Sequence, residues 1–477
     1  MQCPSRRQFL ASAAAGLLGV APLLPILGRV ALAVPTTTIR AGTRVIDVNG
    51  RAVTIFGLTR ADGSHGLTTE VGQRFQVRLE NETDEETLIH WHGMAPPWQQ
   101  DGVPGLSQPA LAADAAYDYD FLIARPGTNW MHSHHGLQEQ VLMAAPLIVR
   151  DPAKAGQDVQ EVVVMFHDFT FRDPNEVLAG LQGGGSAVAT GSGVDHSAMG
   201  HGASATTGAV HLHDVEYDAF LANDRTLDDP EIFHVERGGR VYLRLINGAA
   251  ATNFWIDLDR LEGRLVAVDG MAIEPITGRR FEFAIAQRLD IVLELPQSEG
   301  AWPIFAVREG ERARTGFVLA TRAGSIGKAS AEASQAVAPV GLALERRLQA
   351  ALSLPGRNAD RQHTITITEA PGYLWLLNGA VHGAHVPLEV REGERVEITF
   401  ADQTTMAHPM HLHGHHFQVV AINGERFAGA VRDTVLVPAG GSVTVAFDAA
   451  NPGKWALHCH HLYHMAAGMM TTVEYLP

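Results

Sequence analysis

The 477-residue sequence predicts an all-β protein built from three Greek-key β-sandwich domains. One glycine-led strand pattern occurs three times, at intervals of domain size. Apolar and polar residues alternate in short runs between turns, while long amphipathic helices are scarce. The composition agrees, because only 18% of residues are charged, 46% are hydrophobic, and 48 Gly and 24 Pro supply turns. These features exclude a disordered chain or a coiled coil.

The repeated pattern consists of residues 72–81, 238–247 and 393–402, each starting at or beside a glycine and then alternating apolar with polar residues. Such alternation is typical of a strand with one buried face. The starts are 166 and 155 residues apart, which is the expected size of one domain. We therefore predict three sandwich domains, at residues 34–153, 154–322 and 361–477.

Two stretches interrupt the repeats. Residues 183–213 are rich in Gly, Ser and Ala and include His196, Met199, His201, His211 and His213. We predict a flexible insert, which either captures Cu(I) through thioether and imidazole ligands or is simply a solvated loop. Residues 323–360 are rich in Ala and contain the sequence Glu345-Arg346-Arg347, so we expect a linker with a short helix.

The N-terminus has the features of an export signal at residues 1–33. An Arg6-Arg7 pair precedes an apolar stretch that ends Ala31-Leu32-Ala33, a pattern typical of a twin-arginine signal peptide. The alternative is a membrane anchor, but Pro22, Pro25 and Arg29 interrupt the apolar run, and no other segment could span a bilayer. The sequence thus predicts an exported, periplasmic protein without a membrane span.

Removal of the signal changes the charge and the thiol content. The net charge of −16 becomes −19, since the 36 Lys and Arg lose three members and the 52 Asp and Glu lose none. Nucleic acid and anionic membranes are therefore excluded as partners. Of the two cysteines, Cys3 leaves with the signal and Cys459 stays as a lone thiol. An internal disulfide is impossible in the exported chain, and a single thiol suggests a specific use.

Histidine pairs mark two of the three repeats. Counting 18 residues from each repeat's first glycine reaches a His-x-His pair in the first and third copies but Ile256 in the second. A second set of pairs follows later in the same two copies. Residues two apart on a strand share a face, so each pair can hold neighbouring metal positions. We predict one cluster of three metal ions across the interface of domains one and three, with the ligands His90, His92, His132, His134, His411, His413, His458 and His460.

A separate site follows from the residues between and beyond these pairs. His408 lies three residues before His411, so it faces the opposite side of the strand, and Cys459 likewise faces away from its two histidine neighbours. With His464 and Met469 they form the ligand set of a blue-copper electron-transfer site. One short covalent path, His458-Cys459-His460, would then join the two sites.

These segments resemble the four signature blocks of the three-domain multicopper oxidases, over nearly the whole mature chain. The blocks are 90–93, 132–134, 408–414 and 458–469, and the sequences at 101–105, 138–140, 220–223 and 460–465 are most similar to periplasmic copper-resistance oxidases. The resemblance implies cupredoxin-like domains, four copper ions, and four-electron reduction of O2 to water. It also implies this division of ligands: type 1 copper at His408, Cys459, His464 and Met469; type 2 at His90 and His411; type 3 at His92, His132 and His460, and at His134, His413 and His458.

Oxygen reduction consumes protons, so we expect an acid near the cluster. Asp101 resembles the family's proton-relay acid, although it could simply cap a turn, and Glu139 is a second candidate. Many laccase-like relatives have Glu directly after the histidine that corresponds to His464, whereas this chain has Met465. The surplus residues His135, His415, His416 and His461 are interpreted as supports for the ligands or as surface groups.

The sequence thus predicts a monomeric oxidase that couples oxidation of a small reducing substrate to reduction of O2. Cu(I), oxidised in copper detoxification, is the favoured substrate, and laccase-type oxidation of phenols is the alternative. A periplasmic protein that sequesters copper without turnover is a rival from another class. A degenerate assembly factor is disfavoured because none of the twelve ligands is missing, and a nitrite reductase because that family usually has two domains per chain.

Overall fold

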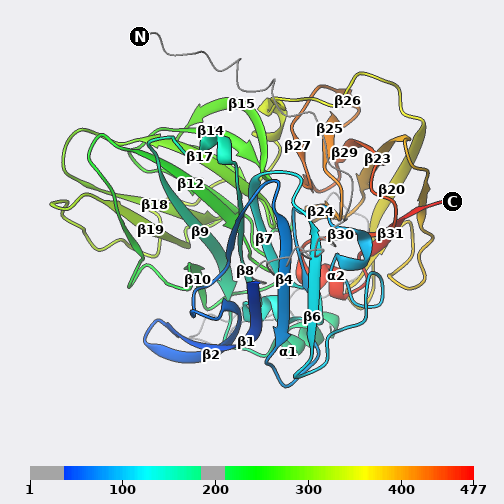
Figure 1. Cartoon of the computed structure of the whole chain (residues 1–477), viewed down its shortest axis with the longest axis horizontal. Helices are drawn as coiled ribbons and strands as arrows, with labels where there is room; N and C mark the ends of the chain where they lie inside the picture. The colour runs from blue at the N-terminus through cyan, green and yellow to red at the C-terminus, as the bar shows by residue number, and fades with distance from the viewer. Residues whose placement is uncertain (1–36, 184–209) are drawn as a thin grey trace, which may run out of the picture. The chain divides into compact units, whose positions relative to one another are not determined.

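A computed structural model describes residues 37–183 and 210–477. Within these residues the chain forms six β-sheets, which follow one another along the sequence as three pairs (Figure 1). Helices are few, and none in the described part of the chain is long and apolar enough to cross a bilayer. The predicted all-β class of three sandwiches is confirmed. The predicted signal at residues 1–33 and most of the 183–213 insert lie outside the described residues.

The first sandwich, residues 37–150, pairs the sheet β2-β1-β4-β6 with the sheet β3-β8-β7-β5. Its core contains Phe75, Leu79, Trp91 and Leu147, all nearly inaccessible to solvent. The elements are β1 (Thr37–Val48), β2 (Arg51–Arg60), β3 (Leu67–Glu70), β4 (Arg74–Asn81), β5 (Ile89–His90), η1 (Trp98–Gln100), β6 (Ala116–Leu122), β7 (Gly127–Ser133), η2 (Gln138–Val141) and β8 (Ala144–Arg150).

The second sandwich, residues 160–320, pairs the sheet β10-β9-β12-β17-β14-β15 with the sheet β11-β19-β18-β13-β16. Its elements are η3 (Pro152–Lys154) just before it, β9 (Gln160–Phe169), α1 (Pro174–Gln182), β10 (Ala219–Ala222), β11 (Ile232–His234), β12 (Arg240–Asn247), β13 (Phe254–Asp257), β14 (Gly263–Val268), β15 (Met271–Gly278), β16 (Arg280–Phe283), β17 (Arg288–Glu294), β18 (Ala301–Arg308) and β19 (Arg314–Ala320). Residues 321–360 then lead to the third sandwich and contain one short helix, η4 (Glu345–Arg347).

The third sandwich, residues 361–475, pairs a seven-stranded sheet around β20, β23, β25 and β29 with the sheet β22-β31-β30-β24-β28. Its elements are β20 (Arg361–Ala370), β21 (Leu374–Leu377), β22 (Leu388–Val390), β23 (Arg395–Asp402), β24 (His408–Leu412), β25 (Phe417–Ile422), β26 (Glu425–Arg426), β27 (Val431–Arg432), β28 (Thr434–Val437), β29 (Ser442–Asp448), β30 (Lys454–Cys459), α2 (Leu462–Ala466) and β31 (Met470–Tyr475).

The three glycine-led segments occupy equivalent places as β4, β12 and β23. Each runs parallel to the first long strand of its sandwich, β1, β9 or β20, and antiparallel to β6, β17 or β29. Alternate residues of β4 and of most of β12 are buried, as the sequence pattern requires. Parallel neighbours that are distant in sequence need crossover connections, so this arrangement repeats a Greek-key topology and not a set of simple hairpins.

The histidine pairs lie on the other sheet of the first and third sandwiches. In the first, β5 pairs with β7 so that His90 is directly opposite His132. In the third, β24 pairs with β30, which places His411 opposite His458 and Met410 opposite Cys459. Directly opposed residues share a face, so both registers bring two imidazoles together. The register also turns Cys459 to the face opposite His411.

Candidate copper centres

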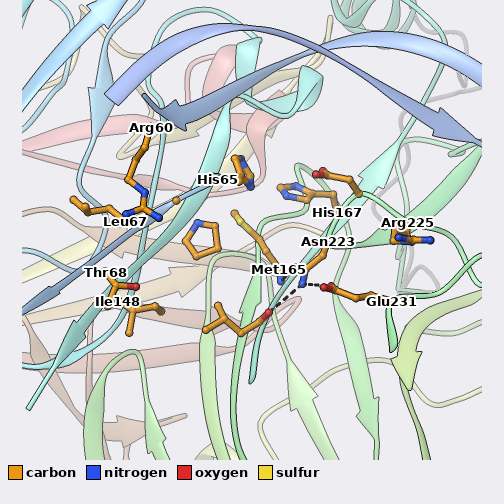
Figure 2. Close-up of a pocket in the computed structure, with 14 residues that line it drawn as sticks. Arg60, His65, Leu67, Thr68, Ile148, Met165, His167, Asn223, Arg225 and Glu231 are labelled. Atoms are coloured by element: carbon orange, nitrogen blue, oxygen red, sulfur yellow. Dashed lines mark hydrogen bonds between the residues drawn. The ribbon is translucent and has the colours of Figure 1, made fainter. Parts of the chain in front are cut away.

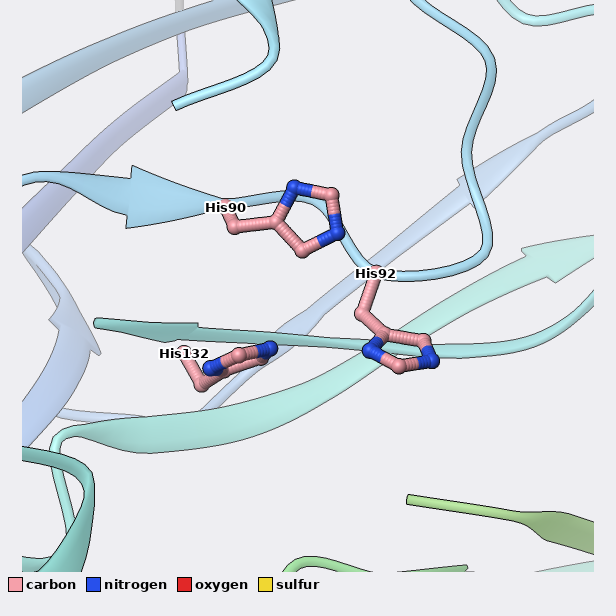
Figure 3. A group of neighbouring side chains, drawn as sticks. All are labelled: His90, His92 and His132. Atoms are coloured by element: carbon pink, nitrogen blue, oxygen red, sulfur yellow. The ribbon is translucent and has the colours of Figure 1, made fainter. Parts of the chain in front are cut away.

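Eight imidazoles from the first and third sandwiches meet in one buried cluster. These residues are at most 9% exposed, and the closest ring pairs, His90 with His413 and His92 with His411, join the first sandwich to the third. Figure 3 shows three of them, with the rings of His90 and His132 extending from paired strands and that of His92 from the segment just after β5. The structure brings together all the histidines that the sequence pairs predict: His90, His92, His132, His134, His411, His413, His458 and His460.

The two predicted sets of three imidazoles are each compact enough to surround one ion. The centroids of His92, His132 and His460 are 4.9 to 5.6 Å apart. Those of His134, His413 and His458 are 5.0 to 5.1 Å apart. The remaining rings, His90 and His411, are 5.8 Å apart and each stacks on a member of another group. Ligand atoms of overlapping triples lie within 4.8 Å of one another, so the groups form one continuous cluster.

The inward-facing nitrogens have no ordinary hydrogen-bond partner. Buried Nε2 atoms of His90, His132, His411 and His460 and the Nδ1 of His92 are unpaired among the described residues. The Nε2 of His458 lies 3.0 Å from that of His413 and 3.3 Å from that of His134, although at most one proton can lie in each gap. Burial and neighbouring imidazoles lower the pKa values of most of these rings, including His92, His132 and His413, which favours neutral rings with free lone pairs. This donor set fits metal ions held by imidazole.

The outward nitrogens of six of the eight rings have an acceptor within hydrogen-bond distance, which fixes the tautomer of those rings. His90 Nδ1 donates to the backbone oxygen of Asp101, and His413 Nδ1 donates to the Asp101 carboxylate at 2.8 Å. Asp101 therefore orients one predicted ligand of the first sandwich and one of the third. Nδ1 of His458 likewise donates to the backbone oxygen of Cys459, and His411 Nδ1 to that of Asp433.

Glu139 occupies the opposite side of the cluster. Its carboxyl oxygens lie 2.8 Å from His132 Nδ1 and 3.8 Å from His460 Nδ1. Burial, together with the nearby charge of Asp168, raises the pKa of Glu139 well above its usual range. Glu139 can therefore keep a proton beside His132 and His460, whereas Asp101 contacts His90 and His413.

The glycine that follows the first His-x-His pair in each of these two sandwiches is required for steric reasons. Gly93 and Gly414 have φ values of 89° and 65°, which L side chains rarely adopt. A Cβ atom would also clash with the Asn129 side chain at Gly93 and with the Trp455 ring at Gly414. The chain can thus turn sharply after each pair while the strand end stays packed against its neighbour.

The second predicted ligand set meets inside the third sandwich. Cys459 Sγ lies 3.8 Å from the Nδ1 atoms of both His408 and His464, which are 3.2 Å from each other. All three side chains are buried, and so is Met469, whose backbone exchanges hydrogen bonds with Cys459 and His464. Burial raises the pKa of the Cys459 thiol, so a bound cation is needed to hold the thiolate.

The outer nitrogens of these two histidines face different surroundings. His408 Nε2 contacts the Thr404 hydroxyl at 2.9 Å, deep in the sandwich. His464 Nε2 lies 2.8 Å from the carboxylate of Asp214, which comes from the second sandwich's segment before β10. The Tyr373 hydroxyl donates to the same carboxylate, and the exposed His211 ring lies 3.5 Å from it.

Some residues beside the predicted ligands belong to no sequence motif. Asp433 Oδ1 lies 3.2 Å from His92 Nε2, and its carboxylate makes a two-pronged ion pair with Arg288 of the second sandwich. Arg288 also donates to the Thr128 backbone oxygen in the first sandwich. All three sandwiches are thus joined beside the cluster. Asp433, Arg288 and Asp214 are not predicted from the sequence. An acid or arginine within an apolar segment is the signal at Asp433 and Arg288, whereas Asp214 lies in a polar segment.

Two of the four surplus histidines, His415 and His461, contact predicted ligands. His415 donates from Nδ1 to the His413 backbone oxygen and contacts the Tyr475 hydroxyl through Nε2. His416 contacts Arg125 across the interface between sandwiches. His461 stacks on His464 with ring centroids 3.7 Å apart. His135 follows the second pair and is only partly buried.

Comparisons with known proteins agree with this geometry. Family profiles described as multicopper oxidase match residues 64–154, 160–323 and 355–477. The multicopper oxidase MmcO of Mycobacterium tuberculosis is 30% identical, over 92% of this chain and 87% of that protein. Copper resistance protein A of Escherichia coli is 27% identical, over 98% of this chain and 99% of that protein. The crystal structure of a laccase from Botrytis aclada superimposes with a TM-score of 0.75 at 21% identity, over 92% and 88% of the two chains. The chain belongs to the multicopper oxidases, and it is therefore a copper-dependent oxidoreductase that passes electrons from a reducing substrate to O2.

Proposed function

We propose that the reducing substrate is Cu(I) and that the enzyme detoxifies copper: four Cu(I) ions, one O2 and four protons give four Cu(II) ions and two water molecules. The observation that carries this choice is the carboxylate of Asp214, 2.8 Å from His464 Nε2. An anionic group on the outer nitrogen of a proposed copper ligand attracts a cation more than a neutral phenol. The neighbouring His211 imidazole adds a further ligand for a cuprous ion.

The proposed resident cofactors are four copper ions with the division of ligands that the resemblance implies. The thiolate set of His408, Cys459, His464 and Met469 would hold type 1 copper. Type 2 copper would take His90 and His411, and the ring groupings support two type 3 positions, one at His92, His132 and His460 and one at His134, His413 and His458. When bound, these ions accept single electrons and supply the four-electron reduction of O2.

The chain's own residues connect the substrate with the cluster. Asp214 accepts a hydrogen bond from His464 Nε2 and holds that ring in place. Cys459 lies between His458 and His460 in the sequence, so covalent bonds lead from the thiolate to two cluster ligands. The hydrogen bond from His458 Nδ1 to the Cys459 backbone oxygen, at 2.9 Å, offers a second short connection. Trp375, stacked on His464 at 3.9 Å, keeps water from this edge.

Protons are the second requirement of the reaction. Asp101 contacts His413 and Glu139 contacts His132, so a carboxyl group stands behind each of two proposed type 3 positions. We propose that Asp101 relays protons to the cluster and that Glu139 assists from the other side. Both acids would act on the outward nitrogen of an imidazole, which keeps the inward nitrogens free for metal binding.

The substrate proposal is tested by removing the charge of Asp214 without changing its shape. Asp214→Asn is compared with Glu216→Gln, a change two residues away in an acid that faces Arg308. We expect kcat/KM for Cu(I) to fall about tenfold or more in Asp214→Asn, while kcat/KM for a phenol changes little, because a neutral donor does not need the charge. Equal losses for both donors, or a phenol preference in the wild type, would favour laccase activity. A copper-loaded protein that consumes no O2 with any donor would indicate sequestration instead.

We also propose that the protein is exported to the periplasm by the twin-arginine route and acts there as a monomer. The Arg6-Arg7 pair ahead of an apolar stretch supports this route. Replacing both arginines by lysine should leave the protein in the cytoplasm, as measured by cell fractionation. Size-exclusion chromatography with light scattering measures the oligomeric state.

A further inference from the structure

A cavity of about 420 Å³ lies between the first and second sandwiches, in a region that the proposed oxidase reaction does not use. It is lined by the end of β2 and the segment after it, by β8, by β9 and by residues 223–231. None of the proposed copper ligands lines it. Figure 2 shows the His65 ring, the His167 ring and the sulfur of Met165 grouped on one side of this cavity.

Both imidazoles are fixed so that one lone pair remains free. His65 Nε2 lies 2.9 Å from the backbone oxygen of Ala144, and His167 Nδ1 lies 2.8 Å from that of Gly248. A carbonyl oxygen only accepts, so these two nitrogens carry the protons and the opposite nitrogens carry lone pairs. Neither His65 Nδ1 nor His167 Nε2 has a hydrogen-bond partner among the described residues. His167 is 3% exposed, and burial lowers its pKa to about 4, so the ring is neutral.

The thioether belongs to the same group. Met165 and His167 are two apart on β9 and so share its face, and both approach the same point beside Gly248, where an added Cβ would contact the Met165 methyl and the His167 ring. Met165 also packs in one cluster with Ala144, whose backbone oxygen holds His65. Two imidazole lone pairs and a thioether sulfur therefore surround one end of the cavity.

The donor atoms around the cavity select the kind of ion. The charged side chains that line it are balanced, because two are cationic, Arg60 and Arg225, and two are anionic, Asp224 and Glu231. The carboxylate of Asp224 is taken by a two-pronged ion pair with Arg44. Neutral imidazole and thioether ligands suit the soft, singly charged Cu(I). Zn²⁺ and Ca²⁺ prefer tighter or harder donor sets, which this end of the cavity lacks.

We propose that His65, Met165 and His167 form an additional site for one cuprous ion between the first and second sandwiches, separate from the electron-transfer centres. Cys459 does not line this cavity, so the site lies apart from the thiolate of the electron-transfer centre. It also links the segment after β2 to β9, so an ion bound there ties two sandwiches together. This proposal does not depend on which substrate the oxidase uses.

The test uses Ag(I), a redox-inert probe for Cu(I), so that the copper-loaded enzyme cannot consume it. Equilibrium dialysis against buffered Ag(I) compares the wild type with His65→Gln, an exposed position, and Met165→Leu, a change that nearly conserves volume. His234→Gln and Met271→Leu, at other positions in the second sandwich, are the matched controls. We expect the wild type and controls to bind one Ag(I) more than both site variants do, beyond any Ag(I) held beside Asp214, and the site variants to bind that ion at least tenfold more weakly.

X-ray absorption at the silver edge gives an independent readout. The wild type is expected to show a sulfur neighbour that disappears in Met165→Leu but persists in Met271→Leu. Unchanged Ag(I) affinity in both site variants, or a silver signal without a methionine-dependent sulfur, would overturn the proposal. Binding of inorganic phosphate by the arginines in place of Ag(I) would also count against it. None of these outcomes depends on oxidase turnover, so failure here leaves the proposed function untouched.

Discussion

The second sandwich differs from the other two in what its equivalent strands carry, not in how they are arranged. β13 and β18 lie side by side in the second sandwich as β24 and β30 do in the third. Where the third has the opposed pair Met410 and Cys459, the second has the opposed pair Ile256 and Ala306, which are completely buried in its apolar core. The ligands are therefore not needed to form the sandwich, and the same fold can exist with or without metal chemistry.

The second sandwich instead contributes polar side chains from a strand end and from a connecting segment. Arg288, at the start of β17, pairs with Asp433 beside His92, and Asp214 reaches His464 from the segment before β10. These polar contacts fix the third sandwich against the second at both proposed centres. The predicted ligands therefore lie in the first and third repeats, while the second repeat supplies residues that position them.

The largest effect is expected at the thiolate. Cys459→Ser replaces a soft ligand by a hard one, so we expect O2 uptake with any donor to fall by about a thousandfold or more and the copper–thiolate absorption to vanish. Ala306→Ser makes a corresponding change in β18 and should leave both signals intact. Copper analysis should show that the Cys459 variant keeps the ions of the imidazole cluster. Substantial residual turnover would mean that electrons reach the cluster by another route.

The next effect concerns the ion pair that joins the sandwiches. Arg288→Gln leaves Asp433 buried without its partner, and breaking such a pair costs about 3–5 kcal/mol of stability. We expect a lower Tm and weaker copper retention at the cluster, measured by calorimetry and by dialysis against a chelator. The exposed pair of Arg74 and Asp120 is the control, because Arg74→Gln should cost less than about 1 kcal/mol. If both variants melt alike, the second sandwich does not support the cluster.

A smaller effect is expected at Asp101, which touches ligands but belongs to the first sandwich. Asp101→Asn removes a proton donor while keeping a hydrogen-bond acceptor for His413, so we expect kcat to fall by about 10–100-fold. Reduction of the thiolate-bound copper by substrate, followed by stopped-flow absorption, should be unchanged. Asp114→Asn, in an exposed turn of the same sandwich, provides the control. Slower thiolate-copper reduction would show that Asp101 affects the whole molecule and not proton delivery.

The sequence predicted the fold because its signals are local and repeated. Alternation at residues 72–81, 238–247 and 393–402 has only one simple structural solution, and strands β4, β12 and β23 adopt it. The positions of the predicted ligands could be anticipated because the strand period of two determines which residues share a face. His408 and Cys459 are the clearest cases, since an odd offset alone separates them from the cluster histidines.

The contacts between sandwiches could not be predicted in this way. Asp433 is 341 residues from His92, and Arg288 is 145 residues from Asp433, so no short-range pattern connects them. A buried charge is visible in a sequence only as an acid or arginine among apolar residues, which does not reveal its partner. Asp214 illustrates the same limit, because its contact with His464 depends on how the second sandwich packs against α2.

The smallest expected effect is the pH dependence contributed by His415, a residue of the third sandwich without a counterpart in the second. Burial lowers the pKa of His415 to about 4, against about 6.5 in the unfolded chain, so the unfolded state binds its proton first. Its contribution to stability is present above pH 6.5 and is lost as the pH falls toward 4. His415→Gln should therefore flatten the fall of Tm between pH 6.5 and pH 4 in scanning calorimetry, whereas the exposed His234→Gln should not. Parallel Tm profiles in all three proteins would mean that His415 titrates alike in both states, and the hydrogen bond to His413 would then not depend on a neutral ring.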